Sequence, residues 1–265
     1  FNAGFLELRR IDWATPAAVL ERVIRYEAVH SIDSWDDLRA RVEPADRRCY
    51  GFFHPQMPDD PLIFVEIALT QGLPDAIATI LDESRKVLDP RTASHAIFYS
   101  ISNCQVGLRG VPFGNYLIKQ VAELLHSELP QLTGFATLSP VPGLARWMAD
   151  EAPDAAGDAA SDPESLRAAA ARYLVHGRSP RGGPLDSVAK FHLGNGARLE
   201  AIHADADRSA KGMKQSHGIM VNYVYDLAQI EANLLSLTAL DTVACSKTVA
   251  TLARESKPSG SRKAA

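Results

Sequence analysis

The first part of the chain, up to about residue 48, shows the apolar spacing of helices. Thr15 and Pro16 form an N-cap and first-turn pair. Apolar residues then recur at helical intervals, at Val19, Leu20, Val23 and Ile24. Residues 31–42 repeat the pattern on a smaller scale. The sequence therefore predicts a helical lead-in over residues 1–45.

Beyond residue 48 the pattern changes to short apolar and aromatic runs separated by turns and helices. Residues 49–53 and 61–70 predict a hairpin, with a turn at 54–60. Strands are also expected at 96–102, 134–138 and 218–225, while 191–193 and 199–203 suggest short strands or a strand-to-helix step. Helices are expected at 73–82, 115–129, 144–149, 166–175 and 227–237. Strands mixed with helices imply an α/β or α+β domain.

Two segments do not fit this regular pattern. Residues 149–165 are rich in Ala, Asp, Pro and Gly and predict a flexible excursion, and residues 255–265 predict a disordered tail. The whole chain of 265 residues is long enough for one sizeable core or two small ones. We interpret residues 1–265 as one catalytic domain.

Composition and charge exclude several classes of protein. The formal net charge is −4 and 46% of the residues are hydrophobic. This balance, without a long Lys/Arg run, argues against nucleic-acid or anionic-membrane surfaces. No apolar run approaches the roughly 18–20 residues that span a bilayer. The three cysteines, Cys49, Cys104 and Cys245, are too widely spaced for a zinc ribbon, and their odd number disfavours a disulfide framework. A reducing, cytoplasmic location fits this pattern.

A glycine-containing loop at residues 105–114 lies between a predicted strand and the predicted helix 115–129. Such a loop directs backbone N–H groups toward one point, and the helix N-terminus adds partial positive charge, which suits a phosphate. The loop lacks both the Walker GK[ST] and the three-glycine dinucleotide pattern. On the loop alone, glycines that only permit tight packing are therefore the favoured interpretation.

Ser139 and His192 are the residues with the clearest chemical potential. Ser139 ends a predicted strand, where α/β ligand sites tend to open, although it also suits a helix N-cap before Pro140. It is not part of a GxSxG elbow. His192 precedes Gly194, Asn195 and Gly196, a setting in which backbone can approach a ligand beside an imidazole. A structural histidine is the alternative there.

Two further patterns have mainly structural interpretations. His203, Asp205 and Asp207 alternate and would share one strand face. Hydrogen bonding or capping by Asp207 is favoured over a metal site. Tyr223 and Tyr225 would likewise share a strand face, as core aromatics with satisfied hydroxyls.

Several segments together resemble the malonyl-CoA decarboxylase family, in the family's order from about residue 4 to residue 225. The similarity is carried by residues 27–30 (EAVH), 47–50 (RRCY), 96–102 (AIFYSIS), 105–110, 114–119, 138–143 (LSPVPG), 191–197 (FHLGNGA), 206–212 and 222–225 (NYVY). Each motif is short, but their combination is specific.

This resemblance implies a GNAT-like acyltransferase fold, with a mixed central sheet flanked by helices. It implies that Ser139 and His192 form the catalytic pair, supported by Tyr225 and Asn195. The CoA would be bound by Ser139, His192 and the loop Arg109, Gly110, Val111, Pro112, Phe113, Gly114 and Asn115. The family often has an acidic residue where this chain has Pro112, so the family's carboxylate has no counterpart at that position in this chain.

The resemblance also implies malonyl-CoA decarboxylation to acetyl-CoA and CO2, in malonate or fatty-acid metabolism, without a metal or other cofactor, since CoA is part of the substrate. In the family an all-helical domain involved in oligomerisation precedes this one, so we expect a homo-oligomer in the longer protein. The chain starts at Phe1, without Met, as if that domain were missing, and it lacks the peroxisomal Ser-Lys-Leu ending.

Two other functions fit the same fold. An acyl-CoA-dependent N-acyltransferase would need an acceptor amine and release no CO2. A non-catalytic CoA-binding regulator would leave malonyl-CoA intact, and the presence of both Ser139 and His192 in matching contexts disfavours it.

Overall fold

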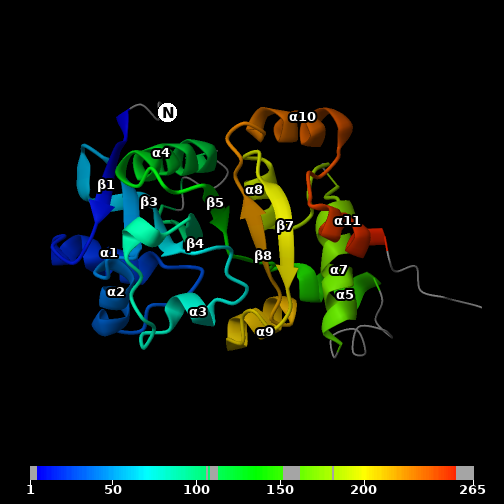
Figure 1. Cartoon of the computed structure of the whole chain (residues 1–265), viewed down its shortest axis with the longest axis horizontal. Coiled ribbons are helices and arrows are strands. Elements are labelled where there is room, and N and C mark those ends of the chain that lie inside the picture. Colours follow the sequence, from blue (N-terminus) through cyan, green and yellow to red (C-terminus); the bar gives the residue numbers. More distant parts are fainter. Residues whose placement is uncertain (1–4, 106, 108–112, 152–161, 181, 255–265) are drawn as a thin grey trace, which may run out of the picture. The chain divides into compact units, whose positions relative to one another are not determined.

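A computed structural model describes residues 5–105, 107, 113–151, 162–180 and 182–254. The chain divides into two compact units, residues 1–138 and residues 139–265, which are described separately (Figure 1). The centre of the predicted excursion, residues 152–161, and the predicted tail lie outside the described residues, whereas the two ends of the excursion belong to helices. The prediction of one catalytic domain stays a prediction.

The first unit is built on a mixed sheet in the order β1-β2-β3-β4-β5. The first four strands pair antiparallel, and β4 pairs parallel with β5. The strands are β1 (Glu7–Ile11), β2 (Arg47–His54), β3 (Met57–Thr70), β4 (His95–Asn103) and β5 (Gly134–Thr137). The helices are α1 (Ala17–Tyr26), α2 (Trp35–Val42), α3 (Ala78–Leu81), the 3-10 helix η2 (Pro90–Thr92) and α4 (Phe113–Glu128).

Most predicted elements of this unit are confirmed, with one correction and two adjustments. The helix expected at 73–82 covers only Ala78–Leu81. The expected lead-in is not purely helical, because β1 forms a strand whose Ile11 pairs with Cys49 of β2. Hydrogen bonds to a strand nearly forty residues away determine that conformation, so local periodicity did not reveal it. The predicted hairpin is β2–β3, but its turn is shorter than expected, since β3 already begins at Met57.

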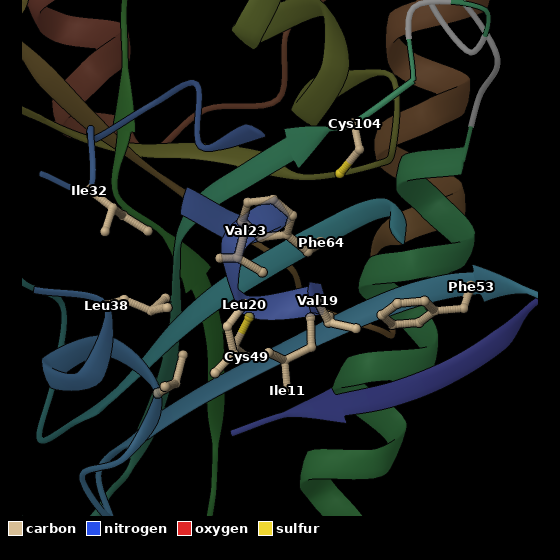
Figure 2. Packing of buried hydrophobic residues seen from close by; sticks show 11 residues of the cluster. Ile11, Val19, Leu20, Val23, Ile32, Leu38, Cys49, Phe53, Phe64 and Cys104 are labelled. Atoms are coloured by element: carbon tan, nitrogen blue, oxygen red, sulfur yellow. The ribbon is translucent and has the colours of Figure 1, made fainter. Parts of the chain in front are cut away.

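Alternate residues of β2 face two different layers, as the period of a strand requires. Cys49 and Phe53 join the core beneath α1 and α2, where Figure 2 shows them with residues from β1, β3 and both helices. Tyr50 and Phe52 point to the other layer: Phe52 stacks on Tyr116 of α4 with ring centroids 5.5 Å apart. Tyr50 Oη donates to Glu128 at the end of the same helix. The sheet is thus flanked by helices.

The second unit contains an antiparallel group of strands with β8 in the middle. β8 (Met220–Val224) pairs with β6 (Ser139–Pro140) on one side and with β7 (Arg198–His203) on the other. The helices are α5 (Leu144–Glu151), α7 (Pro163–His176), α8 (Ser187–Leu193), α9 (Ala210–Ser216), α10 (Ile230–Leu240) and α11 (Lys247–Arg254). The sequence patterns had not indicated α9 and α11. Helices α7 and α11 pack together beside β7 (Figure 1).

No helix among the described residues is long and apolar enough to cross a bilayer.

Candidate active site

Ser139 begins the second unit, at the first position of the short strand β6. Its partner in the ladder is Val221 of the central strand β8, and its side chain is buried. Pro140 and Pro142 favour extended backbone in the residues that precede them. The chain then turns at Gly143 into α5. Ser139 is therefore held by a sheet and is not the N-cap of α5.

His192 lies in the last turn of α8, and only 4% of the residue is exposed. Residues 191–193 are therefore helical and precede β7, so neither the short strand nor the strand-to-helix step predicted there is observed. Asp186 caps the helix: its Oδ1 accepts the N–H groups of Val188 and Ala189 at 2.9 and 3.0 Å. An aspartate immediately before the first turn is a recognised N-cap signal, and it outweighs the strand-like sequence Phe-His-Leu.

The imidazole of His192 joins two hydroxyl groups that are far apart in the sequence. Its Nε2 lies 3.2 Å from Ser139 Oγ, and its Nδ1 lies 2.8 Å from Tyr225 Oη. Tyr225 follows the end of β8 and is buried as well. Sheet and helix thus bring Ser139, His192 and Tyr225 into one hydrogen-bonded chain, which we call the Ser–His–Tyr chain.

Aromatic rings fix the plane of this imidazole. Tyr223 of β8 stacks on His192 with ring centroids 4.7 Å apart and an interplanar angle of 24°. Phe191 meets the ring edge-on, with its centroid at 5.0 Å. The sequence had placed Tyr223 and Tyr225 together on one strand face as core aromatics. Both are buried, but both also contact His192.

Burial controls the protonation of His192 and Tyr225. Loss of solvent lowers the pKa of His192 from 6.5 to about 3, so the ring is neutral near pH 7. Burial also raises the pKa of Tyr225 well above its usual value, which keeps the hydroxyl protonated. A neutral imidazole has one donor and one acceptor nitrogen, and a hydroxyl can match either. The Ser–His–Tyr chain can therefore hold or pass a proton without any buried net charge.

Asn195 lies in the turn after α8, next to the histidine but bonded through its backbone. Its N–H donates to the carbonyl of His192 at 3.1 Å, and the residue is buried. Asn195 as a catalytic residue stays a prediction.

The predicted CoA loop can be followed only in part. Arg109, Gly110, Val111 and Pro112 lie outside the described residues. Phe113, Gly114 and Asn115 form the first turn of α4. The expected helix after the loop is thus confirmed, while its role in binding CoA stays a prediction.

His203, Asp205 and Asp207 have separate hydrogen-bonding roles. His203 Nε2 lies 2.6 Å from Asn222 Oδ1, Asp205 pairs with Arg208, and Asp207 accepts the N–H of Ser209 at 3.0 Å. In the part of the chain that the structure describes, no three His, Cys, Asp or Glu side chains gather as a metal site would require.

Comparison with known proteins places the chain in a family. The profile described as "Malonyl-CoA decarboxylase C-terminal domain" matches residues 4–166 and 152–263. The mitochondrial malonyl-CoA decarboxylase of the goose Anser anser anser is 35% identical in an alignment of 276 positions, which covers 88% of this chain and 55% of that protein. The chain therefore spans about half the length of this curated relative.

Solved structures agree with this assignment. The crystal structure of malonyl-CoA decarboxylase from Agrobacterium vitis is 51% identical, with a TM-score of 0.90 over 95% of this chain and 68% of that chain. The GNAT-like decarboxylase GphF, in complex with isobutyryl-CoA, is 19% identical, with a TM-score of 0.56 over 83% of this chain and 99% of that one. The second likeness concerns the fold, which is GNAT-like as expected. The chain belongs to the malonyl-CoA decarboxylase family and corresponds to its C-terminal domain.

Proposed function

We propose that this chain decarboxylates malonyl-CoA to acetyl-CoA and CO2, and that Ser139 and His192 carry out the chemistry. The observation that carries the proposal is the buried Ser–His–Tyr chain, which presents a hydroxyl and an imidazole 3.2 Å apart in a member of this family. The CoA moiety is assigned to the loop 109–115 and the start of α4, as the family resemblance implies.

The reaction needs an electron sink, a group that stabilises an enolate and a proton donor. When the bond between the α-carbon and the carboxylate breaks, its electron pair moves into the thioester carbonyl, and CO2 leaves. Ser139 donates a hydrogen bond to the malonyl carboxylate or to the developing enolate oxygen. His192 Nε2 then delivers a proton to the α-carbon, which gives acetyl-CoA. The thioester itself is the electron sink, so the proposal includes no metal or other cofactor.

The pKa of His192 fits this sequence of steps. In the free protein the ring is neutral, because burial disfavours the imidazolium. A malonyl carboxylate bound beside it is an opposite charge within a few ångströms, which favours the protonated ring. Substrate binding therefore favours uptake of one proton from solvent by the ring. The ring gives that proton to the α-carbon and returns to its neutral state when the product forms. Tyr225 holds Nδ1 throughout.

The test is incubation of the purified chain with malonyl-CoA labelled with ¹³C in its free carboxylate, without any amine. The expected products are unlabelled acetyl-CoA and labelled CO2, detected by NMR and mass spectrometry. Pretreatment with EDTA should leave the rate unchanged. Product formation only after an amine is added would point to an N-acyltransferase instead. Intact malonyl-CoA in both incubations would contradict the proposal.

Location and assembly complete the proposal. The curated goose relative is described as mitochondrial. For this chain we keep the expectation of a reducing, cytoplasmic location, to which its three unpaired thiols are suited. A homo-oligomer in the longer protein also remains a prediction, which light scattering would test.

A further inference from the structure

Asp186 connects the two segments that carry Ser139 and His192. Its Oδ1 caps α8, the helix of His192, through the N–H groups of Val188 and Ala189. Its Oδ2 accepts the backbone N–H of Gly143 at 3.2 Å, four residues after Ser139. The residue is 2% exposed, so water does not compete for these bonds. One carboxylate thus bridges two stretches of chain that are more than forty residues apart.

The packing around Gly143 shows how close this connection is. A Cβ at residue 143 would overlap the hydroxyl of Tyr173 and would lie 3.3 Å from Asp186 Oδ2. The same hydroxyl donates to Oδ2 at 3.3 Å. The absence of a side chain at Gly143 is therefore what allows the backbone to reach the carboxylate.

We infer that Asp186 is a positioning residue, which sets the distance between Ser139 Oγ and His192 Nε2 by linking the residue 143 turn to the start of α8. The inference rests on the proposed roles of Ser139 and His192. Those two atoms are 3.2 Å apart, and a displacement of about 1 Å in a reacting group can cost about 10²-fold in rate. The Asp186 carboxylate accepts the backbone N–H groups of Gly143, Val188 and Ala189, so the effect passes through backbone.

Asp186→Asn should disrupt the hydrogen bond to Gly143 and keep the helix cap of α8. Asparagine caps helices about as well as aspartate, so its amide oxygen retains the bonds to Val188 and Ala189. Its NH₂ group then faces the N–H of Gly143. Because both groups are donors, the hydrogen bond that Oδ2 accepted is lost. We expect kcat for malonyl-CoA to fall about 10- to 100-fold, while KM changes less than about threefold.

Asp162→Asn is the matched control, because Asp162 caps α7 in the same way, with its Oδ2 accepting the Ser165 N–H at 2.9 Å. It should leave kcat within about twofold. A second variant, Gly143→Ala, disrupts the same hydrogen bond by adding a Cβ beside Tyr173 Oη and Asp186 Oδ2. Because both changes break one connection, the double variant should lose no more activity than the poorer single variant.

A spectroscopic readout is independent of turnover. In protein labelled with ¹⁵N-histidine, Asp186→Asn should shift the Nε2 and Nδ1 resonances of His192, and Asp162→Asn should not. Unchanged His192 resonances together with near-normal kcat would overturn the positioning role, as would losses that multiply in the double variant. If the wild-type chain leaves malonyl-CoA intact, the proposed function fails, and the resonances alone then decide whether Asp186 positions His192.

Discussion

Each unit of the molecule buries polar side chains, and one cluster from each unit shows how differently charge is handled. In the first unit Arg41 is 4% exposed and Glu66 of β3 is fully buried, with Arg41 Nη1 3.4 Å from Glu66 Oε2. Arg41 also binds both carboxylate oxygens of Asp37, at 2.8 and 3.1 Å. In the second unit the Ser–His–Tyr chain contains two hydroxyls and a neutral imidazole.

In the charged cluster the guanidinium of Arg41 is saturated with hydrogen bonds. The remaining guanidinium donors of Arg41 reach the carbonyls of His30 and Ser31 at 2.8 and 2.7 Å. Nearby, Glu27 accepts hydrogen bonds from Ser100 and Ser102 of β4. A buried charge is tolerated only with partners of this kind, so this cluster fixes the α1–α2 connection on the sheet. The Ser–His–Tyr chain carries no net charge that must be neutralised, so its groups can exchange their hydrogen bonds for bonds to a ligand.

The largest effect is expected from His192→Asn, which removes the proposed proton donor from the Ser–His–Tyr chain. A general acid contributes about 10²–10⁴-fold, so kcat should fall by a factor in that range, while CoA affinity stays near normal because the loop 109–115 is untouched. Steady-state kinetics and CoA titration measure the two quantities. His176→Asn, at the exposed end of α7, is the control. Wild-type turnover in His192→Asn would refute the assignment.

Arg41→Met tests the charged cluster, and its effect should be on stability. The change leaves Glu66 and Asp37 without their shared cation, and removal of one partner of a buried pair costs about 3–5 kcal/mol. Urea denaturation should show that loss in the free energy of unfolding. Arg91→Ala, which breaks the exposed pair with Asp89, should leave the midpoint unchanged. An equally small effect of Arg41→Met would remove the contrast between the two clusters.

Acid should weaken the second unit through His192. The unfolded ring binds a proton near pH 6.5, but the folded ring does so only near pH 3. Between these values the unfolded state holds the extra proton. The free energy of unfolding therefore falls as pH drops from 6.5 toward 3, by about 1.4 kcal/mol per pH unit for this group. Urea denaturation at pH 4.5, 5.5 and 6.5 should give a shallower pH slope for His192→Asn than for wild type; parallel slopes would contradict the low pKa.

Tyr225→Phe is the mildest change to the Ser–His–Tyr chain. It removes the hydroxyl that lies 2.8 Å from His192 Nδ1, while the aromatic packing stays. A lost hydrogen bond of about 1 kcal/mol should lower kcat by roughly 5- to 10-fold, with the pH profile displaced because the ring loses its partner. Stopped assays from pH 5 to pH 9 would measure both. Identical profiles would show that Tyr225 does not hold the ring.

The elements with strong periodicity could be predicted, and those held by distant partners could not. The stripe at Val19, Leu20 and Val23 gave α1, and all three residues are buried. β1 was missed because its pairing with β2 gives it its conformation. The end of α8 was expected as a short strand or a strand-to-helix step, although the capping residue Asp186 was visible in the sequence as a helix start signal.

By itself the sequence determined the alternation of strands and helices, the fold class, and, through the family resemblance, Ser139, His192 and Tyr225 as candidate residues. Only the tertiary structure decided that these three form one hydrogen-bonded chain, that the histidine is neutral, and that Asp186 ties the two segments together. The reason is physical: 53 residues separate Ser139 from His192 and 33 separate His192 from Tyr225. Contact and desolvation across such distances arise from packing, which local sequence does not encode.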